Sequence, residues 1–336
     1  MADQVTAYDV AARAGLSVGT VSRYLTGNGY VGEASRARIA RAIGELGYVR
    51  SSAAASLRTR KSGMLGFVVS DLRNPFTAEL AVAIQERARD AGCVVFLAHT
   101  MGEPDRAMEA IDQLQSHGVD GIVITPPASA QLVERLAELR AGGTPVVGIG
   151  LRTDPQVIDL ATVDTRTGAG ELVDHLVGLG HARIGYVGND RSSGRYRGYK
   201  AGLKAAGLEL EQDLIRVGPA DRSTAWDAAE ALLTGRRPPT AIFGFNDATA
   251  LAVLQRAYQI GIRVPEQLSV VGFDDVDLAA HSVPPLTTMA QPKVELGRRA
   301  VDMIIQQLGS GVGEPTTATL TTQLVLRAST AAPHHR

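Results

Sequence analysis

Apolar residues follow two different spacings along the chain, and the change falls near Met64. Before it they recur every three or four positions, as in Val10, Ala11 and Ala14, which indicates short amphipathic helices. After it, short apolar runs alternate with longer amphipathic segments, which is typical of strands alternating with helices. The pattern therefore predicts a small helical head followed by a much larger α/β part.

The α/β part divides into two successive sets of elements. The first set predicts strands over 64–70, 93–98, 119–125 and 145–149, and helices over 76–91, 104–117 and 129–141. The second, from about residue 163, predicts strands over 183–187, 214–217, 241–245 and 268–273, and helices over 167–178, 196–206, 224–233 and 248–260. Two such runs predict two lobes, each a doubly wound parallel sheet. Ligands of such folds bind at the carboxyl ends of strands, so facing lobes would form a cleft.

The stretch Val5–Leu25 predicts two short helices joined by a tight turn. Thr6 is suited to cap the first helix, and Gly15 permits the positive backbone angle that a sharp helix exit requires. Ser17 has the side chain of an N-cap, so the second helix is expected to begin at Val18. This arrangement is a helix-turn-helix, which is typical of DNA-binding heads.

The second helix has two unlike faces. One face is suited to pack on the first helix and is formed by Thr20, Val21, Tyr24 and Leu25. The opposite face is poor in large apolar side chains and consists of Val18, Gly19, Ser22 and Arg23. Small and polar side chains with one arginine suit a helix that lies in the major groove of DNA.

Two other interpretations of this stretch have to be weighed. It could be an amphipathic helical hairpin without a DNA-binding role. Residues 15–19 also match the G-x-S-x-G pattern of a hydrolase nucleophile, which requires a strand before the serine. Only sixteen residues precede Ser17, and they predict a helix, so we interpret that match as accidental.

The rest of the head contains a third helix and a short basic stretch. Apolar spacing predicts the helix over 33–46, and for its arginines solubility and phosphate contact are equally good interpretations: Arg36, Arg38 and Arg41. Residues 51–61 are rich in alanine but too few to stay helical alone in water. They form either a plain linker or a segment that folds on DNA, with Leu57 wedged between base steps in the minor groove.

Charge is distributed unevenly along the 336 residues, whose net charge is −1. Residues 1–61 contain nine Lys/Arg and four Asp/Glu, which places +5 on the head and leaves −6 on the remainder. A basic head on an acidic body is typical of a nucleic-acid-binding module attached to another function. The single cysteine, Cys93, lies in an apolar run and is interpreted as a core residue. The chain shows no signal peptide and no transmembrane-length apolar run, so we expect a cytoplasmic protein without a membrane partner.

The sequence offers no support for catalysis. It contains no P-loop, no H-E-x-x-H motif and no dinucleotide fingerprint between a strand and a helix. Its cysteine and seven histidines are not clustered at metal-ligand spacing. We therefore expect a protein that is not an enzyme, with no catalytic residue, no cofactor and no metal.

Three segments of the head match one family almost position by position: VTAYDVAARAGLSVGTVSRYL (5–25), ELGYVR (45–50) and AAASLRT (53–59). They resemble the DNA-binding head of the lactose/galactose-repressor (LacI/GalR) family of bacterial transcription regulators. The resemblance implies that the bases are read by Val18 and Gly19, with Arg23 nearby and Leu57 as the minor-groove wedge. It implies phosphate contacts by Thr6, Tyr8, Ser17, Thr20 and Ser22. Many members carry arginine where this chain has Ala55, so hinge affinity would depend more on Arg58 and Arg60.

The resemblance continues through seven further segments: DLRNPF (71–76), HLVGLGHARIGYVG (175–188), RYRGYKAGL (195–203), FGFNDATAL (243–251), GIRVPEQLSVVGFDD (261–275), PPLTTMAQPKVELGRRA (284–300) and LRAST (326–330). It implies a two-lobed, periplasmic-binding-protein-like fold whose chain crosses between lobes near residues 162, 290 and 320. We therefore expect a head over 1–50, a hinge over 51–61 and an effector-binding and dimerisation domain over 62–336. Its N-lobe would comprise about 62–162 and 291–320, and its C-lobe about 163–290 and 321–330.

Six polar or aromatic residues lie at predicted strand ends or helix starts, where the family contacts its effectors: Asn74, Phe76, Thr125, Arg195, Asn246 and Asp274. A guanidinium, a carboxylate and an amide around an aromatic surface would hold a polyhydroxylated ligand by paired hydrogen bonds. Turn formation by Asp274 and helix capping by Asn246 are the alternatives. Gly150-Leu151 stands where many members have Asp-Arg, and Thr77 replaces a second aromatic residue, which weakens the case for an ordinary sugar.

Together these features predict a ligand-responsive, sequence-specific regulator of transcription, most simply a repressor that binds a near-palindromic operator as a homodimer. The expected effector is a sugar or sugar derivative, with a nucleoside or purine as the alternative. Two other functions compete with this prediction. A solute-binding protein would have a secretion signal and no DNA head, and an architectural DNA binder would have a cleft without a ligand.

Overall fold

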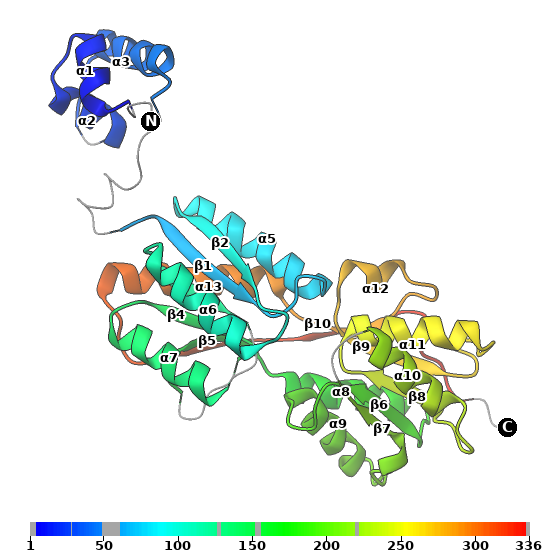
Figure 1. Cartoon of the computed structure of the whole chain (residues 1–336). Coiled ribbons are helices and arrows are strands. Elements are labelled where there is room, and N and C mark those ends of the chain that lie inside the picture. Colours follow the sequence, from blue (N-terminus) through cyan, green and yellow to red (C-terminus); the bar gives the residue numbers. More distant parts are fainter. Residues whose placement is uncertain are drawn as a thin grey trace. The chain divides into compact units, whose positions relative to one another are not determined.

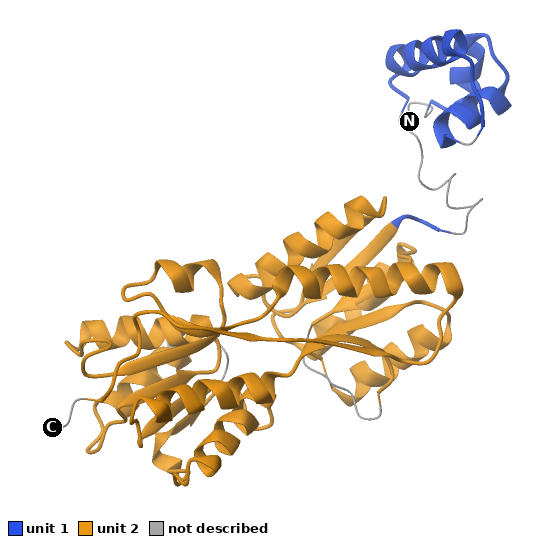
Figure 2. Ribbon diagram, turned by 180° about the vertical axis from the view of Figure 1, so that it is seen from behind, with its two compact units in different colours: residues 1–63 blue, residues 64–336 orange. Residues whose placement is uncertain are grey.

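The computed structural model describes residues 5–27, 29–48, 61–125, 129–151, 156–218 and 222–333. The chain forms two compact units, residues 1–63 and residues 64–336 (Figure 2). Within the described residues, no helix combines the length and the apolar character needed to cross a membrane.

The first unit is a three-helix head built from α1 (Ala7–Ala14), α2 (Val18–Thr26) and α3 (Glu33–Leu46). Thr6 and Asp9 form a capping box at the start of α1, and Gly15 ends that helix with φ of 61°. The buried core that joins the helices consists of Val10, Ala11, Ala14, Val21, Val31, Ile39 and Ala42, and partly buried apolar residues pack around it: Leu16, Val18, Tyr24, Leu25, Ile43, Leu46 and Tyr48. A domain of this size buries little apolar surface, so polar contacts between its helices add to its stability.

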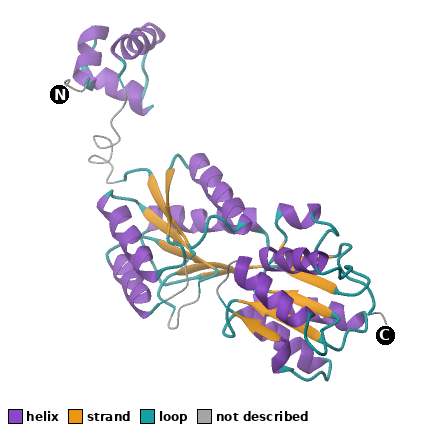
Figure 3. Ribbon diagram, turned by 45° about the vertical axis from the view of Figure 1, so that its right-hand side comes forward, coloured by secondary structure: helices purple, strands orange, loops and turns teal. Residues whose placement is uncertain are grey.

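The first lobe of the second unit is a six-stranded parallel sheet in the order β11-β5-β4-β3-β1-β2. Its strands are β1 (Met64–Val69), β2 (Val94–His99), β3 (Gly121–Ile124), β4 (Val146–Ile149), β5 (Asp159–Val163) and β11 (Thr317–Leu320). Helices α5 (Pro75–Asp90) and α13 (Lys293–Ser310) cover one face, and α6 (Pro104–Ser116) and α7 (Ala130–Ala141) cover the other (Figure 3). The central strands are continuous apolar runs because both faces are covered.

The second lobe repeats this architecture with the strand order β12-β10-β9-β8-β6-β7 (Figure 1). Its strands are β6 (Ile184–Gly188), β7 (Ile215–Val217), β8 (Ala241–Gly244), β9 (Ser269–Asp274), β10 (Thr287–Ala290) and β12 (Gln323–Val325). Helices α8 (Thr165–Gly178) and α9 (Gly194–Ala205) pack on one face. The other face is covered by α10 (Arg222–Leu233), α11 (Asp247–Gln259) and α12 (Asp277–His281).

The chain passes between the lobes after β5, after β10 and after β11, and Figure 2 shows these connections side by side. Strands β5 and β10 both end where the chain leaves their lobe. Since neighbouring strands run parallel to them, the carboxyl ends of both sheets face the boundary between the lobes. This boundary is where a doubly wound fold binds its ligands.

One strand departs from the prediction of purely parallel sheets, because β12 is antiparallel to β10. The chain enters the second lobe directly from the carboxyl end of β11, so β12 starts at the boundary and runs away from it. Four short strands were not predicted individually: β5, β10, β11 and β12. Several strands of similar length were predicted, so length alone does not explain the difference; β5, β10 and β11 end where the chain crosses between the lobes, and β12 follows such a crossing. Leu214 ends a short 3₁₀ helix (Gln212–Leu214) and is not the first residue of a strand.

Candidate DNA interface and ligand site

The turn between α1 and α2 is defined by local hydrogen bonds. The Ser17 hydroxyl accepts a hydrogen bond from the Thr20 N–H at 3.2 Å, so Ser17 is the N-cap of α2. Helix α1, not a strand, precedes Ser17 in the described residues. The Ser17 hydroxyl is therefore a helix cap, as predicted, and the G-x-S-x-G match has no nucleophile geometry.

The outward face of α2 carries exposed Gly19 and Arg23 and half-buried Ser22. Arg23 Nε donates to the Gly19 carbonyl at 3.3 Å, so the arginine lies back along that face. Val18 is different, because it is half-buried and packs against the head core. A side chain in the first turn of a helix tilts toward the preceding residues. The prediction that Val18 points away from the core is therefore only partly right.

Most of the predicted phosphate contacts lie at helix starts. Thr6 caps α1, and Tyr8 in its first turn is 72% exposed. Ser17 caps α2, and Thr20 lies in its first turn. Unpaired N–H groups and the helix dipole favour anions at such positions, so the geometry suits the phosphate backbone. The predicted hinge residues Leu57 and Arg58 lie outside the described residues.

In the second lobe, Arg195 and Asp274 form an ion pair at the carboxyl edge of the sheet. Arg195 Nη2 donates to Asp274 Oδ1 at 2.9 Å, and Nη1 donates to the Phe245 carbonyl at 2.7 Å. The guanidinium also lies over the Phe273 ring, 4.2 Å from its centroid. The structure therefore brings two of the six predicted effector residues into direct contact.

Asn246 lies next to this pair and caps α11. Its Oδ1 accepts a hydrogen bond from the Thr249 N–H at 2.8 Å, and its side chain is buried. The preceding residue, Phe245, provides the carbonyl that receives Arg195. The capping role weighed as an alternative is thus present, and Asn246 directly follows the residue whose carbonyl receives Arg195.

The three predicted residues of the first lobe lie at its boundary edge. Asn74 caps α5 and accepts from the Phe76 N–H at 3.1 Å, while Thr125 Oγ1 accepts from the Ser70 N–H at 3.4 Å. Phe76 packs against the apolar cores of both lobes. In the part of the chain that the structure describes, no hydrogen bond joins Asn74 or Thr125 to the Arg195–Asp274 pair.

The Gly150-Leu151 pair contributes no polar group to this edge. Leu151 is buried in the core beneath α6 and α7. Gly150 has φ of 66°, and a Cβ atom added there would meet nothing within 4 Å. Where many family members have Asp-Arg, this protein therefore has a glycine followed by an apolar core residue.

A second buried carboxylate, Asp247, lies close to Asp274. Thr288 Oγ1 donates to Asp247 Oδ1, and the Val276 N–H donates to Oδ2 at 2.8 Å. Burial, reinforced by repulsion from Asp274, raises the pKa of Asp247 to about 7. Burial also raises the pKa of Asp274, although the charge of Arg195 opposes the increase. The edge of the second sheet thus holds two carboxylates whose protonation depends on each other.

Sequence reasoning missed two residues that hold Asp274 in place. Gln291 Nε2 donates to Asp274 Oδ1 at 2.6 Å, and Lys293 Nζ donates to the Asp274 carbonyl at 3.1 Å and to that of Asp275. Lys293 also pairs with Glu79 Oε2 of α5 at 3.2 Å, which connects the site to the first lobe. Both residues lie in PPLTTMAQPKVELGRRA, but only the folded crossing brings that segment back to Asp274.

The backbone at Asp274 and Asp275 is unusual, with φ of 121° and 54°. Positive φ is strained for residues other than glycine, and such strain persists where surrounding contacts compensate for it. Here Lys293 Nζ donates hydrogen bonds to the carbonyls of Asp274 and Asp275, and Arg327 Nη2 donates to Asp275 Oδ1 at 2.7 Å. The sheet edge therefore presents Asp274 in a fixed orientation.

Comparisons with known proteins agree with this geometry. Residues 6–51 match the profile described as bacterial regulatory proteins, lacI family, and residues 173–330 match a periplasmic binding protein-like domain. The HTH-type transcriptional regulator DegA of Bacillus subtilis is 34% identical over 299 residues, 88% of each chain. The ribose operon repressor of Escherichia coli is 32% identical over 90% of this chain and 93% of the repressor. The solved lac repressor dimer bound to operator and the anti-inducer ONPF matches with a TM-score of 0.87 at 27% identity, covering 98% of this chain and 100% of that one.

This chain belongs to the lacI family of bacterial regulatory proteins. The resemblance inferred from its motifs is confirmed, and so are the α/β fold class and DNA-binding regulation of transcription. The relatives are transcriptional regulators. Within the described residues, no group of three or more His, Cys, Asp or Glu side chains is arranged to hold a metal ion.

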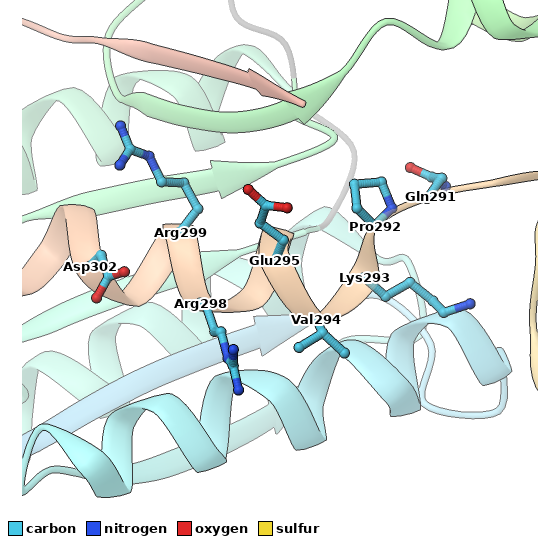
Figure 4. Close-up of a pocket in the computed structure, with 8 residues that line it drawn as sticks. All are labelled: Gln291, Pro292, Lys293, Val294, Glu295, Arg298, Arg299 and Asp302. Carbon is cyan, nitrogen blue, oxygen red and sulfur yellow. The ribbon is translucent and has the colours of Figure 1, made fainter. Parts of the chain in front are cut away.

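Two cavities in this lacI-family chain lie beside the predicted ligand residues but are not lined by them. The larger, about 700 Å³, follows α13 (Figure 4) and is lined by Gln291, Pro292, Lys293, Val294, Glu295, Arg298, Arg299 and Asp302. The other, about 330 Å³, lies by the carboxyl end of β6 and includes Phe245 and Thr249, near Asn246. The larger cavity is lined mainly by charged and polar side chains, and Gln291 and Lys293 belong both to it and to the contacts of Asp274. The Arg195–Asp274 edge is the candidate ligand site because it lies at the carboxyl ends of the strands, where a doubly wound fold binds ligands.

Proposed function

We propose that this lacI-family regulator is a ligand-responsive repressor that binds a near-palindromic operator as a homodimer. Two heads related by two-fold symmetry would read two half-sites, because the symmetry of the protein is mirrored in the DNA. A small molecule bound between the lobes would change their arrangement and, through it, the spacing of the heads. The proposal implies a cytoplasmic protein without catalytic activity.

The observation that carries the effector part is the Arg195–Asp274 ion pair at the boundary between the lobes, in which Asp274 is buried and Arg195 is half-buried. The Arg195 guanidinium and the Asp274 carboxylate, with the Gln291 amide bound to that carboxylate and the Phe245 carbonyl bound to that guanidinium, combine donors and acceptors at one edge. Such a set suits the adjacent hydroxyl groups of a sugar or sugar derivative. The name of the related ribose operon repressor supports this class. From the first lobe, Asn74, Phe76 and Thr125 would complete the site.

For the DNA part, we propose a head over residues 1–50, a hinge over 51–61 and a ligand-binding and dimerisation domain over 62–336. Val18, Gly19 and Arg23 would contact base edges. With valine and glycine in this group, direct hydrogen-bond readout is limited, so thymine methyl contacts and DNA deformability would add specificity. Phosphate contacts would come from Thr6, Tyr8, Ser17, Thr20 and Ser22, and hinge contacts from Leu57 and Arg58.

The experiment that tests this function is selection of duplexes from a random DNA pool with the purified protein. The enriched duplex is then titrated in the presence of a panel of sugars, sugar phosphates, nucleosides and purines. An enriched palindrome whose affinity changes with one compound establishes a ligand-gated regulator and the direction of its response. A palindrome that ignores every compound supports an architectural DNA binder, and no enriched sequence would contradict the DNA-binding proposal itself.

A further inference from the structure

Arg38 on α3 reaches across the head to the turn of the helix-turn-helix. Its Nη2 donates to the Gly15 carbonyl at 3.0 Å and to the Ala14 carbonyl, which lie 23 and 24 residues earlier in the chain. These carbonyls belong to the end of α1, where the last carbonyls of a helix have no partner within it and carry partial negative charge. A guanidinium is therefore well suited to this position, because it is a cation with several donors.

The turn is built to receive this side chain. The Leu16 N–H donates to the Ala11 carbonyl at 3.0 Å and the Gly15 N–H to that of Ala12 at 3.2 Å, so turn amides satisfy the earlier carbonyls of α1. A Cβ atom at Gly15 would lie 2.6 Å from Arg38 Nη2. The φ of 61° favours glycine at this position, and a side chain there would displace the Arg38 guanidinium from the turn.

We propose that Arg38 is a positioning residue for DNA reading, because its guanidinium fixes the turn from which α2 starts. Helix α2 contributes the fully buried Val21 to the apolar core of the head, and Val18, Tyr24 and Leu25 pack against that core while partly exposed. The direction of α2, and with it the placement of Gly19 and Arg23, also depends on how the end of α1 is held. The inference rests on the DNA-binding function and adds a residue that need not touch DNA.

A second polar connection between α1 and α3 supports this arrangement. Glu45 of α3 accepts from Arg13 Nε of α1 at 2.6 Å and from Arg41 Nε on its own helix at 2.8 Å. These hydrogen bonds hold the pKa of Glu45 below its usual range. The Arg13–Glu45 bond holds the α1–α3 pair together, whereas Arg38 acts on the turn itself. Within the described residues of the head, Arg41 forms its side-chain hydrogen bond and ion pair with Glu45 of its own helix. Arg41→Ala therefore removes one positive charge from α3 without removing a contact with the turn, and it serves as the control for loss of charge.

The test compares full-length wild-type protein with Arg38→Ala, Arg38→Lys and Arg41→Ala. Affinity is measured for the duplex enriched from a random pool and for a scrambled duplex of equal length, over a range of salt concentrations. For Arg38→Ala we expect about tenfold weaker binding to the enriched duplex, since two hydrogen bonds to a charged group are lost. For the scrambled duplex, the affinity of Arg38→Ala and the salt dependence of that affinity should be close to the values for Arg41→Ala. Hydrogen exchange of the Leu16 amide should become faster in Arg38→Ala only.

Other outcomes would overturn the proposal. If Arg38→Ala and Arg41→Ala reduce the affinity for both duplexes by the same factor, Arg38 acts only through its charge. Arg38→Ala could instead be the one variant that lowers affinity, by the same factor for both duplexes. If the salt dependence of its affinity also falls by about the amount expected for one phosphate contact, Arg38 binds the DNA backbone. If Arg38→Ala does not fold, Arg38→Lys decides, because an ammonium keeps the charge without the planar fork. If Arg38→Lys keeps the wild-type ratio of affinities for the enriched and the scrambled duplex, the positioning role is contradicted. If the wild type enriches no duplex at all, the DNA-binding function itself is contradicted.

Discussion

At the scale of single residues, the proposed ligand site at the carboxyl edge of the second sheet contains two buried carboxyl groups. Asp247 is fully buried, and its pKa of about 7 lies well above the ordinary value for aspartate because it is desolvated and faces Asp274. In the unfolded chain the same carboxyl loses its proton near pH 4. Folding therefore takes up a proton between about pH 4 and pH 7, and the contribution of Asp247 to stability falls as the pH rises through that range.

Asp247→Asn tests this linkage, because asparagine does not titrate and has a similar shape. The free energy of unfolding of Asp247→Asn, relative to wild type, should increase between pH 4 and pH 7 by up to a few kcal/mol. Loss of the acceptor for the Val276 N–H adds an offset that does not vary with pH. Denaturant unfolding of both proteins at several pH values measures the difference. Stability curves that stay parallel across this range would contradict the raised pKa.

The reading face gives a second prediction at this scale. Arg23 is the cation of the outward face of α2, so Arg23→Ala should weaken binding to the enriched duplex by about tenfold or more, as expected for a base contact. Binding to a scrambled duplex should fall much less. Fluorescence titrations of both duplexes provide the measurement, with Arg41→Ala as the control for charge. Equal losses on the two duplexes would assign Arg23 to the phosphate backbone.

At the scale of elements, the packing of α13 on α5 depends on a glycine. A Cβ atom at Gly297 would lie 2.9 Å from Ala83 Cβ and 3.2 Å from the backbone nitrogen of Ile84. The helices approach closely because no side chain separates them there. Apolar spacing predicted α5 to within one residue at each end. It could not show this approach, because a glycine in a helical pattern does not indicate which other helix will pack against it.

Gly297→Ala should therefore destabilise the second unit by about 1–3 kcal/mol, the size expected for overpacking, despite the better helix propensity of alanine. The matched control is Gly170→Ala in α8, where an added Cβ would meet nothing within 4 Å. That control should be neutral or stabilise by up to about 1 kcal/mol. Urea unfolding of the full chain measures both effects. A stabilising Gly297→Ala would show that α5 and α13 separate without cost.

At the scale of the whole molecule, several large apolar side chains of the second unit face solvent. Val283 is 93% exposed beside α12, and Val94 and Phe96 lie exposed on β2, an edge strand of the first sheet. Apolar groups and an open strand edge suit association with another surface. This distribution agrees with the proposed homodimer.

Dimerisation makes a quantitative prediction about DNA. A duplex with two enriched half-sites should bind at least about a hundredfold more tightly than one with a scrambled half-site, because the second head binds at high effective concentration. Sedimentation of the free protein should show a dimer at the concentrations used. Val283→Asp should lower both the dimer fraction and this ratio. A ratio near two would indicate that the heads act independently.

Local patterns in the sequence determined the helices, the longer strands and the caps at Thr6, Ser17 and Asn246, because periodicity and capping involve residues only a few positions apart. The direction of β12, the contacts of Gln291 and Lys293 with Asp274, and the reach of Arg38 to Gly15 were decided by the tertiary structure. These contacts join residues 17 or more positions apart, or follow from where a crossing enters a lobe. The spacing of residues along the chain does not predict these long-range contacts, because they depend on how whole helices and strands pack.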